Sequence, residues 1–297
     1  MQTRSLGPGF AVEVLGVDPS RPVSPAEAAE LHDLLDAHEL LVLRAPQLDA
    51  EAHVDFLALF GPIYDESRDQ SGLSYVSNVV GVFPNGRLLF HQDFAFTPYP
   101  HRVQSLYGQE LQGAVAPTLF VSNSRAYERL SEPQREAWRG LNAVHARNAG
   151  KSGRNDDEFT RVELRKLPNS DDVKLYPRAT HPVINRHPRT GKPLLFVNEY
   201  YTSHIPELAP DAGEQVIQDA CALLYAPEHI YAHDWRVGDL VVWDNIALQH
   251  ARSQVKPDTR RTLRRILVND HVGEPELRQR AGAHLHRLAP PDASRRL

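Results

Sequence analysis

His91 and Asp93 stand two residues apart, and His250 follows 157 residues after Asp93. In a β-strand, residues i and i+2 point to the same face of the sheet, so His91 and Asp93 can share a site while Gln92 points away. A third side chain at that site has to come from a distant strand. This spacing therefore predicts a fold that brings strands far apart in the sequence side by side.

Two imidazoles and one carboxylate form the facial triad of a mononuclear non-haem Fe(II) site. Three protein ligands on one face of an octahedron leave three positions open for other molecules. The pattern H-x-D also occurs by chance, and histidines that lie on the surface or form hydrogen bonds are the alternative interpretation. The triplet alone leaves both interpretations open.

A run of arginines follows His250, in the segment 260–268. If Leu263, Arg265 and Leu267 share one face of a strand, Arg265 points into the interior. A buried guanidinium is costly unless it is paired, and a carboxylate that binds it in a bidentate manner is its natural partner. We expect Arg265 to bind an anion, and Arg260 and Arg264 to be solvated.

The chain resembles the TauD/TfdA family of Fe(II)/2-oxoglutarate-dependent dioxygenases over about residues 5–272. The motifs that carry the resemblance are His91-Gln92-Asp93, the block Trp243-Asp244-Asn245 with His250 after it, Arg265 fifteen residues later, Phe60-Gly61-Pro62, Pro117-Thr118-Leu119-Phe120, and His187-Pro188-Arg189-Thr190-Gly191 followed by Leu195-Phe196-Val197-Asn198. Several motifs in this order are specific, although each alone is weak.

The resemblance implies that Fe(II) is bound by His91, Asp93 and His250. It also implies that Arg265 pairs with the distal carboxylate of 2-oxoglutarate, that Thr118 hydrogen-bonds the same end, and that Arg261 lies near this co-substrate. With O2, such an enzyme oxidises an unactivated C–H bond of a small organic molecule by hydroxylation, desaturation or cyclisation, and releases succinate and CO2. Halogenating relatives lack the carboxylate that Asp93 supplies, so halogenation is not expected.

Two other functions stay open at this point. One is a metal-dependent hydrolase or isomerase on a cupin-like barrel, with Zn or Mn on the same ligands. Such an enzyme needs no carboxylate anchor, so Arg265 argues against it. The other is a non-catalytic sensor of iron or 2-oxoglutarate, which an intact triad together with Arg265 disfavours and which would form no succinate.

The residues that contact the substrate are less constrained by the sequence. Candidates for the pocket are Tyr75, Asn78, Arg87, Phe196, Tyr201 and His204, with Phe83, Phe94 and Tyr200 as further wall residues. Arg87 lies four residues before His91 and suits an anionic group, but it can equally be an exposed turn arginine. The tyrosines suit a larger and less polar ligand. His101, His145 and His181 are expected to be structural.

Composition limits the partners and the compartment. A net charge of −5 and a pI near 6.3 give no electrostatic sign of nucleic-acid binding. No apolar run approaches the roughly 20 residues that a membrane helix needs, and the first residues lack a signal peptide's apolar stretch. A single cysteine, Cys221, provides no disulfide. We expect a cytoplasmic enzyme with a small-molecule substrate, and leave a dimer or tetramer open.

Patterning predicts a mainly β fold with flanking helices, a double-stranded β-helix or jelly roll of the cupin kind. We expect helices over 24–35, 49–60, 132–141 and 211–225, and strands over 10–14, 40–44, 75–79, 88–93, 102–109, 117–123 and 194–197, with a turn at Gly238-Asp239 between two further strands. One domain spans 1–297, with a core over 5–272 and a polar tail over 275–297. The segment 146–176 is either a lid or a surface loop.

Overall fold

The computed structural model describes residues 1–66, 71–79, 86–146, 177–256 and 258–271. Its strands are β1 (Gln2–Gly7), β2 (Ala11–Leu15), β3 (Leu40–Arg44), β4 (Ser74–Ser77), β5 (Leu88–His91), β6 (Val103–Gln112), β7 (Thr118–Ser122), β8 (Asn142–Ala146), β9 (Arg178–Pro182), β10 (Ile184–Arg186), β11 (Pro193–Leu195), β12 (Thr202–His204), β13 (Tyr231–His233), β14 (Asp239–Asp244), β15 (Leu248–Arg252) and β16 (Arg260–Val268). The helices are α1 (Pro25–His38), α2 (Ala50–Ala58), α3 (Asn123–Glu128), α4 (Glu132–Trp138), α5 (Pro210–Leu224) and the short 3-10 helix η2 (Pro227–His229).

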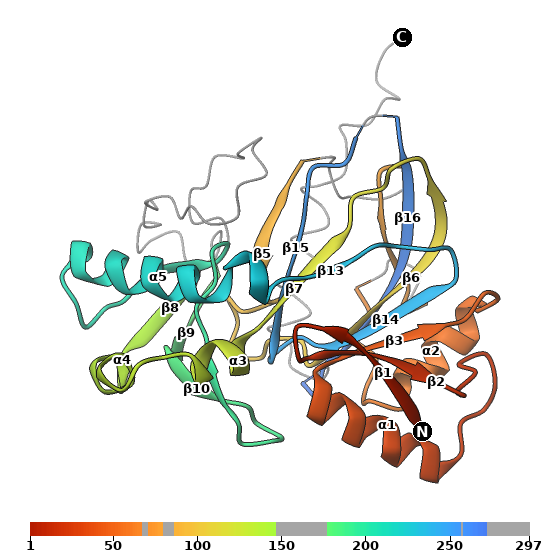
Figure 1. Cartoon of the computed structure of the whole chain (residues 1–297), viewed down its shortest axis with the longest axis horizontal. Coiled ribbons are helices and arrows are strands. Elements are labelled where there is room, and N and C mark those ends of the chain that lie inside the picture. Colours follow the sequence, from red (N-terminus) through yellow and green to blue (C-terminus); the bar gives the residue numbers. More distant parts are fainter. Residues whose placement is uncertain (67–70, 80–85, 147–176, 257, 272–297) are drawn as a thin grey trace.

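Two sheets face each other and form the predicted jelly roll (Figure 1). The larger sheet has seven strands in the order β1-β2-β3-β14-β6-β16-β4, and the smaller has four in the order β13-β7-β15-β5. Neighbouring strands in both sheets are antiparallel, except that β2 runs parallel to β3. Two further small sheets, β12-β8-β9 and β10-β11, lie beside the four-stranded sheet.

Along the central strands, side chains point alternately into the core between the two sheets and into the outer layers. Phe120 of β7 and Trp243 of β14 point between the sheets, where their ring centroids are 5.3 Å apart. Their neighbours Val121 and Val242 point outward into two different clusters. This period of two is what a strand imposes when both of its faces are buried.

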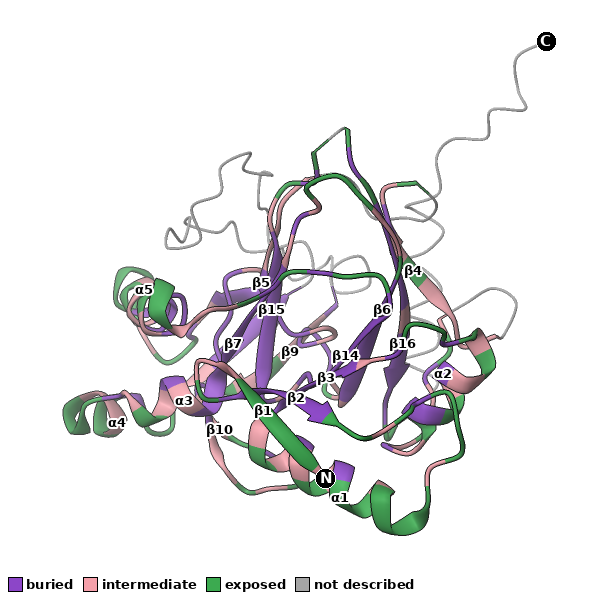
Figure 2. Cartoon of the chain, turned by 45° about the vertical axis from the view of Figure 1, so that its right-hand side comes forward, coloured by how far each residue is buried: buried purple, intermediate pink, exposed green. Residues whose placement is uncertain are grey.

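The helices cover the outer faces of the two sheets (Figure 2). Helices α1 and α2 pack on the seven-stranded sheet, and α3 and α5 pack behind the four-stranded one. Ser24 caps α1 as expected, with Glu27 completing the capping box. Cys221 is buried in α5. Within the described residues, no helix combines the length and the apolar character needed to cross a bilayer.

The predicted elements differ from the structure in two ways. The expected strand 88–93 ends at His91, and Asp93 lies in the following turn, where Phe94 adopts a φ of 64°. Strands β1, β8, β9, β10 and β12 and helix α3 were not predicted, because each is short or weakly patterned. The tail over 275–297 and the segment 146–176, apart from Ala146, lie outside the described residues.

Arg264 is buried, so the prediction that it is solvated is wrong. Its guanidinium donates to His53 Nδ1 at 3.0 Å and to the carbonyl oxygens of Leu48 and Asp49, both at 2.7 Å. It also lies over the Tyr107 ring, 4.9 Å from the centroid. Because α2 begins beside β16, the arginine binds carbonyls at the start of that helix. Its neighbour Arg260 is exposed and pairs with Glu110, as expected.

Replacing Arg264 with alanine should destabilise the fold. The change leaves the buried carbonyl of Leu48 without this donor, and removes one of the two donors of the Asp49 carbonyl, which also accepts from the backbone N–H of His53. Since hydrogen bonds to charged groups are worth about 1.5–3 kcal/mol each, we expect a loss of about 3 kcal/mol in the free energy of unfolding. Urea denaturation measures it. Arg260→Ala, which removes an exposed ion pair, is the control and should cost less than about 1 kcal/mol. Equal losses would contradict the buried role of Arg264.

Candidate metal centre

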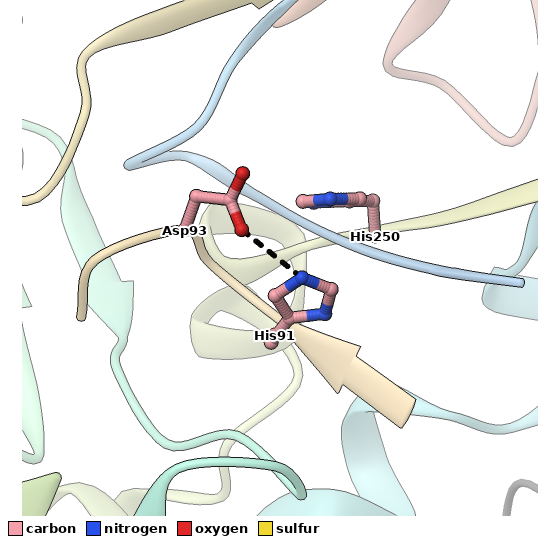
Figure 3. Close-up of side chains that lie close together, drawn as sticks. All are labelled: His91, Asp93 and His250. Atoms are coloured by element: carbon pink, nitrogen blue, oxygen red, sulfur yellow. Dashed lines mark ion pairs between the residues drawn. The ribbon is translucent and has the colours of Figure 1, made fainter. Parts of the chain in front are cut away.

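His91, Asp93 and His250 meet between the two sheets (Figure 3). His250 lies on β15 directly opposite His91 on β5, and Asp93 reaches the same place from the turn after β5. One ligand atom from each residue lies within 4.8 Å of the others. The two imidazole centroids are 4.2 Å apart, and His91 Nε2 is 3.2 Å from Asp93 Oδ1.

Hydrogen bonding sets the orientation of the His91 ring. Its Nδ1 lies 2.8 Å from the Leu89 carbonyl oxygen, so Nδ1–H donates there and the lone pair of Nε2 faces Asp93. A lone pair and a carboxylate oxygen repel each other unless a proton or a cation lies between them. A histidine held by a backbone carbonyl through its other nitrogen is the usual arrangement of a metal ligand.

Electrostatics keep the three groups in the forms that bind metals. Burial alone would raise the pKa of Asp93, but the contact with His91 and the charge of Arg265 hold that pKa well below the ordinary value. Burial lowers the pKa of His250 to about 3. At neutral pH the cluster therefore offers a carboxylate and a neutral imidazole.

Asn245 holds the Asp93 turn in place. Its Oδ1 accepts from the backbone N–H of Asp93 at 2.9 Å and from Gln104 Nε2 at 2.8 Å. Its Nδ2 donates to the carbonyl oxygens of Asp93 at 3.0 Å and of His101 at 2.8 Å. Asp244 accepts from the backbone N–H groups of two residues that lead into β15. The block that begins at Trp243 therefore positions the site, because Asn245 holds the turn that carries Asp93 and Asp244 holds the turn that leads into β15.

A second polar cluster surrounds Arg261, a residue that is only 2% exposed. Its Nε donates to the Ala116 carbonyl oxygen and its Nη2 to Thr118 Oγ1, at 3.1 and 2.9 Å. Thr118 Oγ1 accepts a second bond, from Trp235 Nε1 at 3.0 Å, which leaves its own hydrogen to donate. Arg261 Nη1 has no hydrogen-bond partner in the described part of the chain.

Arg252 lies beside this cluster and was not singled out in the sequence. It stands opposite Thr118 in the pairing of β15 with β7, two residues after His250 and so on the same face of β15. Burial lowers the pKa of Arg252 to about 10; burial and then the charge of Arg252 lower that of Arg261 to about 9. The i+2 spacing from His250 is a signal that could have identified it.

Arg265 is also near the metal ligands but has different partners. Its Nη1 lies 3.3 Å from Asp93 Oδ2, its Nε donates to Ser74 Oγ at 3.1 Å, and its Nη2 pairs with Glu66. Burial alone would lower its pKa, but the charges of Glu66 and Asp93 raise it. Thr118, which was expected to bind the same end of 2-oxoglutarate as Arg265, is hydrogen-bonded to Arg261.

Aromatic residues close one side of the metal ligands. The rings of Tyr200 and Tyr201 have centroids 5.5 and 5.8 Å from that of His91. Phe196 is buried in the same cluster as Tyr201 and Phe96. Phe94, in the turn after Asp93, packs against Phe96. Of the predicted wall residues, Tyr200 and Tyr201 therefore lie next to His91, and Phe94 and Phe196 lie in the neighbouring aromatic cluster.

Other predicted pocket residues lie elsewhere. Tyr75 is 36% exposed and pairs with Arg264, on the outer face of the sheet, so its prediction as a wall residue is wrong. Asn78 is fully engaged in holding β16, since its Oδ1 accepts from Arg261 N and its Nδ2 donates to the Thr259 carbonyl oxygen. His204 contacts Ser203. Phe83 lies outside the described residues.

Arg87 is buried, with 1% of its side chain exposed, and lies 3.9 Å from Glu199. The interpretation as an exposed turn arginine is therefore wrong.

The other histidines have hydrogen bonds that are in keeping with structural roles. His101 bonds to Asn269, His145 bonds to Asn198, and His181 bonds to backbone carbonyls. Burial lowers the pKa of His101 to about 4.

Comparison with known proteins identifies similar sequences. The profile described as "Taurine catabolism dioxygenase TauD, TfdA family" matches residues 2–267. Pentalenolactone F synthase of Streptomyces avermitilis is 28% identical, over 92% of this chain and 95% of the relative. The "alpha-ketoglutarate-dependent 2,4-dichlorophenoxyacetate dioxygenase" of a Burkholderia species is 26% identical, over 88% of this chain and 91% of the relative.

Solved structures with a similar fold include AAD-2 in complex with Mn(II) and N-oxalylglycine. That structure has a TM-score of 0.75 at 24% identity, with 90% of this chain and 96% of that chain covered. A taurine dioxygenase from Burkholderia xenovorans has a TM-score of 0.72 at 24% identity, with 90% of each chain covered. These likenesses agree with the arrangement of two facing sheets.

Removing the side chain of Asn245 should weaken metal binding without touching a ligand atom. Asn245→Ala loses the bonds that fix both backbone groups of Asp93, so the carboxylate is no longer held beside the imidazoles. Loss of such supporting partners typically costs about 10–100-fold in metal affinity. An anaerobic calorimetric titration with Fe(II) measures this, with Gln218→Ala, on the exposed face of α5, as the control. Unchanged affinity in Asn245→Ala would contradict the positioning role.

Proposed function

The chain belongs to the TauD/TfdA family of Fe(II)/2-oxoglutarate-dependent dioxygenases, and on that premise we propose which of its residues bind the metal and the co-substrate. As a member it is an oxidoreductase that uses Fe(II), 2-oxoglutarate and O2 to oxidise a small organic molecule. The cupin-type hydrolase and the non-catalytic sensor are therefore set aside.

We assign Fe(II) to His91, Asp93 and His250. Two neutral imidazole nitrogens and one carboxylate oxygen are the donor set that suits this ion. The orientation of His91 supports the assignment, because its Nε2 lone pair points at Asp93 Oδ1 and a cation between them removes the repulsion. The hydrogen bond that His91 Nδ1–H donates to the Leu89 carbonyl oxygen then fixes the ring.

We assign the distal carboxylate of 2-oxoglutarate to Arg261 and Thr118, and not to Arg265. The observation that carries this assignment is a buried cluster of unused donors. Arg261 Nη1 has no partner among the described residues, and the Thr118 hydroxyl keeps its hydrogen after accepting two bonds. An ionised carboxylate that receives both donors satisfies them and balances the buried charge of Arg261.

The position of the cluster also fits a five-carbon diacid. Arg252 and Thr118 are opposite each other, and so are His250 and Phe120. The anion-binding cluster is therefore one same-face step from His250, which is about 7 Å along the strand. A 2-oxoglutarate molecule with its keto-acid end at the metal can reach Arg261 with its other carboxylate. N-oxalylglycine, present in the AAD-2 structure, has the same chain length.

When bound, the Fe(II) and 2-oxoglutarate supply the activation of O2 that oxidises a C–H bond and yields succinate and CO2. Arg261 and Thr118 orient the co-substrate, and Tyr200 and Tyr201 beside His91 limit access of water. Because Asp93 supplies a carboxylate, we propose hydroxylation, desaturation or cyclisation and no halogenation. The relatives named for pentalenolactone F and 2,4-dichlorophenoxyacetate support a small organic substrate.

Loss of either histidine should abolish the metal complex. Under anaerobic conditions, Fe(II) and 2-oxoglutarate together should give a weak visible charge-transfer band. His91→Ala and His250→Ala should each remove the band, because each deletes one of three protein ligands. His229→Ala, at the partly exposed 3-10 helix η2, should retain it. A band that persists unchanged in both ligand variants would refute the triad.

Loss of Arg261 should weaken co-substrate binding. Arg261→Gln leaves a carboxylate unpaired in a buried site, at a cost of about 2–5 kcal/mol, which is roughly 30-fold or more in the dissociation constant. Titration of the charge-transfer band with 2-oxoglutarate measures this constant. Arg260→Gln, at the exposed adjacent position, should stay within about twofold of the unmodified protein. A loss in Arg265→Gln with none in Arg261→Gln would contradict the assignment.

A further inference from the structure

The arginines near the metal centre differ in their charge balance. Arg265 pairs with Glu66 and lies 3.3 Å from Asp93 Oδ2, so two carboxylates contact one guanidinium. Arg87 lies 3.9 Å from Glu199, and both side chains are buried. Arg261, in contrast, has no carboxylate partner in the described ranges and keeps an unpartnered Nη1. The donors suited to an added anion are therefore at Arg261.

Glu66 pairs with Arg265 beside the metal ligands, and so takes a donor that an added anion would need. Its side chain and that of Arg265 are both 11% exposed, so the pair is largely shielded from water. The Nε of Arg265 donates a hydrogen bond to Ser74 Oγ at 3.1 Å. Nη1 faces Asp93 and Nη2 faces Glu66, so each nitrogen of the guanidinium already has an acceptor.

We propose that Glu66 is a specificity-determining residue, and that the substrate presents an uncharged group to the pair of Arg265 and Glu66. This inference rests on the proposed function, because it concerns the substrate side of the same metal centre. A carboxylate, sulfonate or sulfate placed there adds a third anion to one guanidinium. In a site with little water, the like charges repel strongly.

The pair still provides recognition for an uncharged polar group. The Glu66 carboxylate accepts hydrogen bonds from a hydroxyl or an amide N–H. Selection against anions by a fixed negative charge is a common means of discrimination, since specificity depends on the difference between two binding energies. The substrate class that fits is a small organic molecule with a hydroxyl or amide group on the side that meets Arg265.

Two small probes that differ in charge test this proposal. Methanesulfonate and methanesulfonamide have nearly the same shape, and only the first is an anion at neutral pH. The protein is loaded with Mn(II) and 2-oxoglutarate, and the paramagnetic relaxation of the probe's methyl protons is measured by NMR. Relaxation requires binding close to the metal, so a titration gives a dissociation constant for that place alone.

The variant Glu66→Gln tests the role of this carboxylate, because it removes one negative charge and keeps the shape of the side chain. We expect it to bind methanesulfonate at least about tenfold more tightly than the unmodified protein does, because Arg265 gains an uncompensated positive charge. Methanesulfonamide should bind both proteins within about threefold, since it has no net charge to be repelled. Adding Arg265→Gln to Glu66→Gln should abolish the gain.

Glu110→Gln is the matched control, because it also breaks an arginine–glutamate pair on β16, at exposed Arg260. It should behave like the unmodified protein. Tight binding of methanesulfonate to the unmodified protein, within about threefold of Glu66→Gln, would overturn the proposal, since Glu66 would then yield to anions. Absence of any anion binding in Glu66→Gln, or a gain that survives the loss of Arg265, would overturn it as well.

The same samples separate this inference from the function on which it rests. Relaxation of the 2-oxoglutarate protons by Mn(II) reports that the metal and the co-substrate are bound together. If that relaxation is absent, the assignment of metal and co-substrate residues fails, and the inference fails with it. If the relaxation of the 2-oxoglutarate protons is present, the metal and co-substrate are bound as proposed. If, in addition, each sulfonyl probe binds Glu66→Gln as tightly as it binds the unmodified protein, only the specificity role of Glu66 fails.

Discussion

The antiparallel register between β5 and β15 is the constraint on which the metal centre depends, because it sets His250 directly opposite His91. A shift by one residue would turn His250 to the other face of its sheet and separate the two imidazoles. The same strand β15 pairs with β7 on its other side, where Arg252 stands opposite Thr118. One strand therefore fixes both the metal ligands and the proposed co-substrate cluster.

Strand β16 uses four arginines in four different surroundings. Arg261 and Arg265 point to the interior, four residues apart and so on one face. Arg264 points to the other face and holds the start of α2, while Arg260 is exposed at the strand's beginning. Neighbouring carboxylates distinguish the two interior arginines. Glu66 balances the charge of Arg265, whereas Arg261 has no such partner among the described residues. The charge pattern thus separates the side proposed to bind the co-substrate anion from a charge-balanced side.

Much of the architecture could be predicted from local sequence, because strand alternation and helix caps act over a few residues. The capping box at Ser24 and the strand Leu40–Arg44 follow from such patterns, whereas the meeting of His91 with His250 was expected from the resemblance to a family. The partners of the arginines could not, since they depend on contacts between distant segments. Thr118 Oγ1 accepts from both Arg261 and Trp235, which come from two other segments, and Glu66 lies in a loop that has no pattern.

A crystal structure of the protein with Fe(II) and 2-oxoglutarate bound, from crystals grown without oxygen, would show both binding sites at once. We expect iron on His91 Nε2, Asp93 and His250. We also expect that the distal carboxylate contacts Arg261 Nη1 and the Thr118 hydroxyl, and that Glu66 stays on Arg265; this arrangement defines the proposed site. A distal carboxylate bound to Arg265 in place of Glu66, or iron held by other residues, would contradict it.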